Sequence, residues 1–155
     1  AQASTTVWQP AYTEYRPQWA FGFGLGYSTV TYSNVTLSCS TIRVGAPITA
    51  TVRVANSGAV AQRETVMLFT RQPSRFNLAP ENYRLRAFKK VDLAPGESKT
   101  VSLQLRAEDL AFWDADLKQR IAPSAVIIAI NPYTQHAIAA EAHVDADPTS
   151  YIDSV

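Results

Sequence analysis

Alternating apolar and polar residues recur along the chain and predict β-strands. In residues 48–54, Ile48, Ala50, Val52 and Val54 alternate with threonine and arginine. Successive side chains of a strand point to opposite faces, so this pattern indicates a strand with one face in a core. Similar strand signals occupy residues 29–37, 83–93, 101–105 and 138–144.

Two uninterrupted apolar runs add further strands to this set. Residues 65–70 are apolar on both faces, which is typical of a central strand, and residues 125–130 also form a strand-like run. About seven short strands with turn signals between them predict an all-β fold, an immunoglobulin-like sandwich. The chain lacks the Cys–Trp–Cys pattern of antibody domains, so we expect a fibronectin type III-like sandwich with an irregular N-terminal segment.

Local signals mark two structural features between the strands. Pro95 and Gly96 suit the two central positions of a type II turn, because proline presets one φ and glycine permits the positive one. Residues 108–114 fit a single helical turn with acidic residues at its amino end. Trp113 follows the apolar pair Leu110 and Phe112 in this turn, and we predict that its ring lies in the core.

These signals divide the chain into three parts. Residues 1–28 are an aromatic and glycine-rich linker or docking segment, residues 29–146 are the sandwich, and residues 147–155 are a C-terminal tail. In the first part, prolines interrupt any helix, and glycine at every second position of 22–26 lets one side of the chain approach another backbone closely.

The first part also holds more rings than the sandwich core needs, and Trp and Tyr are typical anchors of interfaces. We therefore predict that it meets a partner. The predicted interface residues are Trp8, Tyr12, Tyr15, Trp19, Phe21, Phe23 and Tyr27. The alternative, in which these rings pack on their own sandwich, stays open.

Composition narrows the range of functions. A chain of 155 residues with a net charge of +1 suits one globular domain and offers no electrostatic attraction for nucleic acid. No apolar run is long enough for a membrane span. Cys39 is the only cysteine, which excludes an internal disulfide and a cysteine-based zinc cluster, and we expect no metal or other cofactor.

No set of residues predicts catalysis. The acidic side chains around the helical turn, Glu108, Asp109, Asp114 and Asp116, are expected to cap and solvate it. His136 and His143 are seven residues apart, an odd spacing that sends two strand residues to opposite faces, so they do not predict a shared metal ion.

Two kinds of surface site stay open. Trp8, Trp19 or Trp113 would have to be exposed to form a sugar-stacking platform, as in carbohydrate-binding modules. Asn34 begins an Asn-Val-Thr glycosylation sequon, which matters only in a eukaryotic secretory pathway.

Three segments, in order, carry a family resemblance. They read AFGFGLGYSTVTYSNV (20–35), TVRVANSGAVAQRETVMLFTR (51–71) and LRAFKKVDLAPGESKTVSLQLRAEDLAFWD (85–114). This series resembles the C-terminal fibronectin type III-like domain of family-3 glycoside hydrolases, the β-glucosidase and β-xylosidase group. The sequence departs from the family pattern at Gly26, where a serine is usual, and at residues 122–125, where the usual Pro-Gly-x-Tyr is absent.

The resemblance implies a non-catalytic accessory domain. The catalytic residues of that family lie in other domains, so it carries no catalytic residue over to this chain. It implies catalytic glycosidase domains as partners, in the same polypeptide or a separate chain, and it favours a secreted or periplasmic location. The alternatives are a free-standing interaction module or subunit, or a carbohydrate-binding module.

Overall fold

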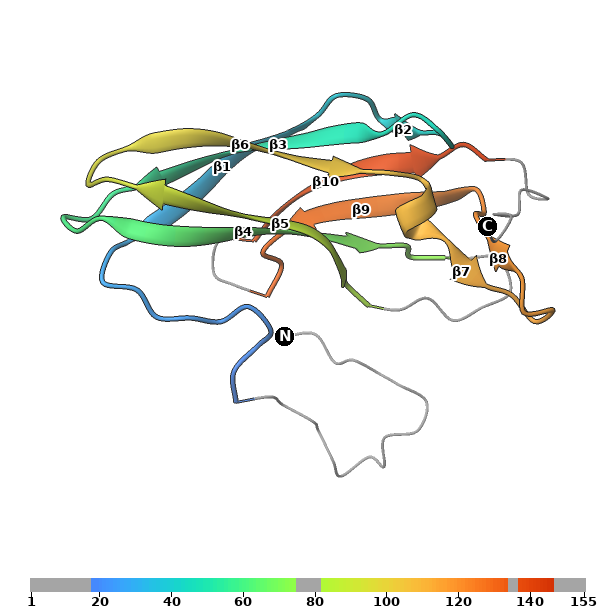
Figure 1. The fold of residues 1–155 in the computed structure, drawn as a ribbon, viewed down its shortest axis with the longest axis horizontal. Coiled ribbons are helices and arrows are strands. Elements are labelled where there is room, and N and C mark those ends of the chain that lie inside the picture. Colours follow the sequence, from blue (N-terminus) through green and yellow to red (C-terminus); the bar gives the residue numbers. More distant parts are fainter. Residues whose placement is uncertain (1–17, 75–81, 134–136, 147–155) are drawn as a thin grey trace.

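The computed structural model describes residues 18–74, 82–133 and 137–146 as two main β-sheets packed face to face and a small two-stranded sheet (Figure 1). One sheet has three strands in the order β1-β3-β6. These strands are β1 (Val30–Leu37), β3 (Ile48–Asn56) and β6 (Ser98–Leu105). The other sheet has five strands in the order β2-β10-β9-β4-β5. They are β2 (Thr41–Ile42), β10 (Ile138–Val144), β9 (Ser124–Ile130), β4 (Gln62–Arg71) and β5 (Arg84–Leu93).

Seven of these strands are longer than two residues, and each corresponds to a stretch that the sequence pattern predicts. Among the described residues every pairing is antiparallel except that of β2 with β10. Residues 65–70 lie within β4, which pairs with β9 on one side and β5 on the other, as expected of a central strand. The predicted immunoglobulin-like sandwich of the fibronectin type III kind is confirmed.

The hydrophobic core lies between the two sheets. Val52 of β3, Val66 of β4 and Ile128 of β9 are each at most 1% exposed. In β3 the inward positions alternate with more exposed ones along the whole strand, which explains why the period-two pattern was so clear there. Burying one such aliphatic side chain contributes about 1.5–3 kcal/mol, so the core positions fix the register of both sheets.

The turn between β5 and β6 has the predicted geometry. Gly96 has φ of +71°, and the Glu97 N–H donates to the Ala94 carbonyl at 3.0 Å, which closes a four-residue turn around Pro95 and Gly96. The Glu97 carboxylate accepts a second hydrogen bond, from the Ala94 N–H at 2.8 Å. Gly96 supplies the positive φ that an L side chain rarely adopts.

Two predictions for residues 108–114 are wrong. The helical turn is a 3-10 helix that covers only Glu108–Leu110, because Ala111 is extended with ψ of 150°. Phe112 and Trp113 then form the two-residue strand β7 (Phe112–Trp113), which pairs with β8 (Gln119–Arg120). Neighbouring residues of a strand face opposite ways, so Phe112 is buried while the Trp113 ring is 60% exposed and lies outside the core.

Candidate docking surface

A segment before the first strand, residues 18–28, lies beside the five-stranded sheet, on the side away from the three-stranded sheet (Figure 1). We call this segment the arm. It approaches β4 closely at two glycines. A Cβ at Gly22 would overlap the methyl group of Met67, and one at Gly26 would overlap the side-chain amide of Gln62. Gly22 and Gly26 therefore allow a close approach, but toward side chains of β4 and not toward the backbone that the spacing predicts, and a Cβ at Gly24 would meet nothing within 4 Å.

A group of aromatic rings joins the arm to the sandwich. The Trp19 and Phe23 rings stack with centroids 4.6 Å apart. The Phe21 ring meets the edge of Phe69 at 5.9 Å, and Phe69 in turn meets Tyr133 at 5.7 Å. Phe69 is only 2% exposed although it stands outside the central core, because these rings cover it. Such edge-to-face pairs add about 0.5–1.5 kcal/mol beyond burial.

The outward side of the arm is exposed and apolar. Exposed fractions are 61% for Trp19, 62% for Phe21, 48% for Phe23, 90% for Leu25 and 96% for Tyr27. The rings thus touch their own sandwich and also present apolar surface to solvent. A monomer seldom exposes such a contiguous patch, so the interface role stays a prediction with structural support. Trp8, Tyr12 and Tyr15 lie outside the described residues.

A chain of hydrogen bonds fixes the C-terminal end of the arm. The Ser28 N–H donates to Gln62 Oε1 at 3.1 Å, and Gln62 Nε2 donates to the Glu64 carboxylate at 3.2 Å. The Tyr32 hydroxyl donates to the same carboxylate at 2.6 Å and accepts from Asn131 Nδ2 at 2.9 Å. This relay links the arm, both sheets and the end of β9 through partly buried groups.

Backbone contacts at both ends extend the relay. Asn131 Oδ1 accepts from the Met67 N–H at 2.9 Å, next to the point where Gly22 covers the Met67 side chain. The Ser28 hydroxyl donates to Asn56 Oδ1 at 2.5 Å. A buried polar group that loses its hydrogen-bond partner cannot replace it with water, which costs free energy. The relay therefore holds the arm in one register.

The relay changes the acidity of one group. Burial raises the pKa of the Tyr32 phenol well above its ordinary value of 10.0, and the hydrogen bond to Glu64 raises it further. The phenol therefore stays neutral and keeps donating its proton to the carboxylate at ordinary pH.

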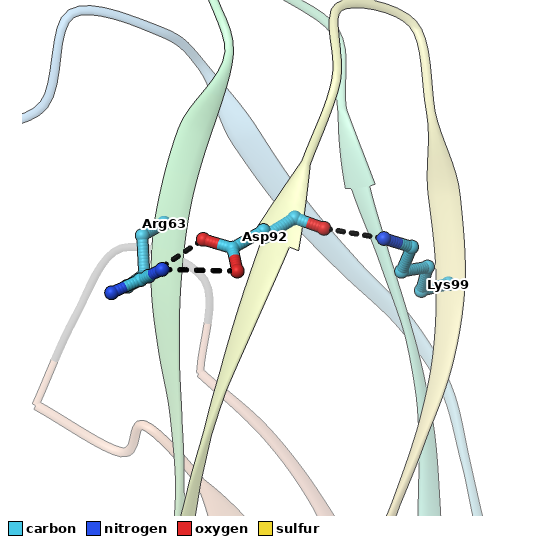
Figure 2. A network of polar contacts seen from close by, with 3 residues as sticks. All are labelled: Arg63, Asp92 and Lys99. Carbon is cyan, nitrogen blue, oxygen red and sulfur yellow. Dashed lines mark hydrogen bonds and ion pairs between the residues drawn. The ribbon is translucent and has the colours of Figure 1, made fainter.

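An exposed polar cluster joins β4, β5 and β6 but encloses no site. Figure 2 shows Arg63 of β4 donating to both carboxylate oxygens of Asp92, at 2.6 and 3.2 Å, while Lys99 donates to the Asp92 carbonyl at 2.6 Å. The hydrogen bond from Arg63 lowers the pKa of Asp92. A shallow depression of about 370 Å³ lies beside these residues. Such exposed pairs contribute little to stability and create no catalytic chemistry.

The other candidate groups have structural contacts. Glu108, Asp109 and Asp114 accept hydrogen bonds from backbone N–H groups, Glu108 from Gly45 in a loop far away in the sequence. The N-cap residue of the 3-10 helix, Ala107, makes no side-chain cap hydrogen bond, so these acidic residues hold loops more than they cap the turn. Within the described ranges no three His, Cys, Asp or Glu side chains gather as a metal site would require. His143 is on β10, and His136 lies outside the described residues.

Two sequence features stand at the surface. Asn34 is exposed and has φ of +55° at an irregularity in the pairing of β1 with β3, so its sequon is accessible and glycosylation stays a prediction. Cys39 is a free, exposed cysteine. No helix in the described part of the chain has the length and apolar character of a membrane span.

Sequence reasoning missed the residues that hold the arm. Gln62, Glu64 and Tyr32 occupy inward positions of strands, where a polar residue among apolar ones is a signal of a buried hydrogen-bond network. Asn131 follows the apolar run 125–130 and has φ of +45°, a conformation that asparagine tolerates better than most residues. Neither signal identifies the partner, because the contacts join residues up to 99 positions apart.

Comparison with known proteins places this fold in a family. Residues 64–131 match the fibronectin type III-like domain. The chain is 38% identical over 109 residues to a periplasmic β-glucosidase of Salmonella typhimurium, and 32% identical over 122 residues to a β-xylosidase of Formosa agariphila. These matches cover 69% and 79% of this chain but only 14% and 17% of the two relatives.

Solved structures agree with the sequence relatives. A β-glucosidase from Erythrobacter marinus superposes with a TM-score of 0.78 at 27% identity, over 88% of this chain and 18% of that one. The chain is therefore a fibronectin type III-like domain. It belongs with the domains of this class found in family-3 β-glucosidases and β-xylosidases, and the resemblance inferred from its sequence is confirmed.

Proposed function

We propose that this chain is a non-catalytic accessory domain of a β-glucosidase-like glycoside hydrolase, and that it packs against the catalytic domains through the arm. The observation that carries the proposal is the exposed aromatic row on a domain that matches only 14% and 17% of the length of its two relatives. An interface buries aromatic anchors of this kind at its centre. A segment held against β4 by two glycines and a hydrogen-bond relay presents those anchors in a fixed arrangement.

The absence of activity in the isolated chain is part of the proposal. Glycoside hydrolysis requires two carboxyl groups facing each other across the sugar, roughly 5–10 Å apart. Acidic residues with described contacts instead hold loops, pair with cations at the surface or, in the case of Glu64, accept hydrogen bonds within the relay. The domain then contributes to the enzyme by stabilising the catalytic domains and fixing their arrangement.

An assay on two polypeptides tests this function. The coding sequence around residues 1–155 should specify catalytic glycosidase domains in the same frame or in a partner gene. The whole assembly should hydrolyse an aryl β-glucoside or β-xyloside, and purified residues 1–155 should not. Turnover that tracks the purified chain would contradict the proposal, and so would a genome in which no glycosidase polypeptide accompanies it.

The alternatives have less support. A free-standing module and a carbohydrate-binding module both remain compatible with the sandwich fold alone. The two sequence relatives are a β-glucosidase and a β-xylosidase in which the matching domain is a minor part, which favours the accessory role. The exposed Trp113 ring is by itself a single surface aromatic, and scattered ones are common on proteins.

A further inference from the structure

An exposed phenylalanine continues the arm surface onto the edge of the sheet. Phe88 of β5 is 61% exposed and lies directly opposite Met67 of β4 in the strand register. Directly opposed residues of an antiparallel pair have Cβ atoms about 4.5–5.5 Å apart. Gly22 of the arm lies against the Met67 side chain, so arm, Met67 and Phe88 form one continuous apolar strip.

A cation stands beside this strip. Lys90 is two residues beyond Phe88 on β5, so the two side chains are on the same face of the sheet, whereas Lys89 between them is on the opposite face. Lys90 is exposed, and among the described residues it has no hydrogen bond or ion pair. The next residue on this face, Asp92, is already paired with Arg63. A surface that covers Phe88 would therefore bring its own charges close to the Lys90 ammonium group.

We propose that Phe88 and Lys90 form a second part of the docking surface, and that its occupant is an apolar pocket bordered by carboxylates on the catalytic part of the same glycosidase polypeptide. This inference rests on the proposed function and specifies the chemistry of the partner surface. Phe88 fills the pocket, and a carboxylate at its rim neutralises the Lys90 ammonium group. Charge complementarity of this kind sets the orientation of two surfaces more than it sets their affinity.

A competing explanation assigns Lys90 to edge protection alone. β5 is at the end of the five-stranded sheet, and lysines on edge strands prevent pairing with other chains. Edge protection needs charge of either sign, whereas docking against carboxylates needs positive charge. Replacing Lys90 with glutamate therefore separates the two roles, because it keeps a charged side chain on the edge and reverses its sign.

Zero-length cross-linking of the whole glycosidase polypeptide tests the inference. A carbodiimide joins an amine to a carboxylate only where the two are in contact. We expect mass spectrometry to find Lys90 joined to an Asp or Glu outside residues 1–155 of the same molecule. The yield should fall about tenfold in Phe88→Ser, the change expected for loss of about 1.4 kcal/mol of contact energy. The matched control Val44→Ser, which removes another exposed apolar side chain, should leave the yield unchanged.

The substitution Lys90→Glu gives the second readout. Hydrogen exchange of the β5 amides should become faster in the whole polypeptide, while the isolated chain keeps its thermal stability. Arg53→Glu, at an exposed position of β3 in the other sheet, is the matched control. It should change neither the hydrogen exchange of the β5 amides nor the thermal stability of the isolated chain. Stability of each isolated variant shows whether it folds.

The outcomes distinguish the two proposals. Absence of these cross-links, together with protection of the arm in the whole polypeptide, would overturn this inference and leave the proposed function standing. If neither the cross-links nor the protection of the arm were found, the inference and the proposed function would both be overturned. Cross-links that join two copies of the chain, or β5 exchange that the charge reversal leaves unchanged, would also contradict the inference.

Discussion

Gly22 lies against Met67 so closely that a Cβ at position 22 would overlap the Met67 methyl group. Gly22 also has φ of +85°, which L residues rarely adopt. The methyl group is the end of a flexible side chain and can move aside, so the backbone conformation is the stronger constraint. This contact and the relay from Ser28 define how the arm rests on β4.

Substitution of Gly22 should release the N-terminal half of the arm. Gly22→Val forces a β-branched residue to positive φ, at a cost of about 1–2 kcal/mol, and we expect protease cleavage between residues 18 and 25 to become about tenfold faster. The measurement is limited proteolysis of the isolated chain followed by mass spectrometry. Gly24→Val is the matched control, because nothing lies within 4 Å of a Cβ at that position. Equal cleavage of the two variants would show that Gly22 does not hold the arm.

The relay should contribute measurably to stability. Gln62→Ala removes the acceptor for the Ser28 N–H and a donor to Glu64, and we expect a loss of about 1–2 kcal/mol in the free energy of unfolding by urea. Arg63→Ala, one residue along β4, removes only the solvent-exposed pair with Asp92 and should cost much less. A smaller loss for Gln62→Ala than for Arg63→Ala would contradict the relay.

Tyr32 should make the fold sensitive to alkaline pH. The unfolded phenol ionises with a pKa of 10.0, whereas burial and Glu64 raise the pKa in the folded state above that value. The folded state thus favours the neutral phenol, and the stability this contributes is complete below pH 10 and is lost as pH rises above it. The added slope approaches about 1.4 kcal/mol per pH unit.

The control for this pH dependence is Tyr32→Phe. This variant lacks the phenol proton, so its unfolding free energy should fall less steeply than that of the wild type between about pH 10 and pH 11. Urea unfolding at several pH values provides the comparison. Parallel curves for the two proteins would show that the Tyr32 hydroxyl ionises equally well in both states.

Truncation of the two residues of β7 should lower the free energy of unfolding by very different amounts. Phe112 is 6% exposed, and Phe112→Ala should cost about 3–5 kcal/mol, as large-to-small changes in a packed interior do. Trp113 is 60% exposed, and Trp113→Ala should cost less than about 1 kcal/mol. Thermal unfolding of both variants measures the difference, and a larger loss for Trp113 would place its ring in a buried contact.

The sequence predicted the long strands because each has one face in the core and therefore a period of two. It also predicted the turn at Gly96, since proline and glycine restrict the backbone locally. β2, β7 and β8 have two residues each, too few for any period to show, and their pairing depends on distant segments. The prediction that Trp113 lies in the core was wrong for the same reason. In a helical turn its ring would face the core, whereas in the two-residue strand β7 it faces solvent.

The candidate surface was only partly predictable. The alternation of aromatic residues and glycine in residues 21–27 identified the arm. Exposed rings and glycines that allow close contact with β4 are both visible as a pattern in the local sequence. Its contact with Met67, its relay through Gln62 and the continuation to Phe88 depend on which strands are neighbours in the sheet. From the sequence alone Phe88 looks like any apolar strand residue. Only the strand register and the sheet order show that it is on the exposed side of an edge strand.

Hydrogen exchange of the arm tests the central claim most directly. Amides of residues 18–27 are compared in the isolated chain and in the whole glycosidase polypeptide, under the same pH and temperature. We predict that they exchange at least about tenfold more slowly in the whole polypeptide, because the catalytic domains cover the exposed rings. Equal exchange in the two forms would show that the arm packs only on its own sandwich, and would contradict its role as the docking surface.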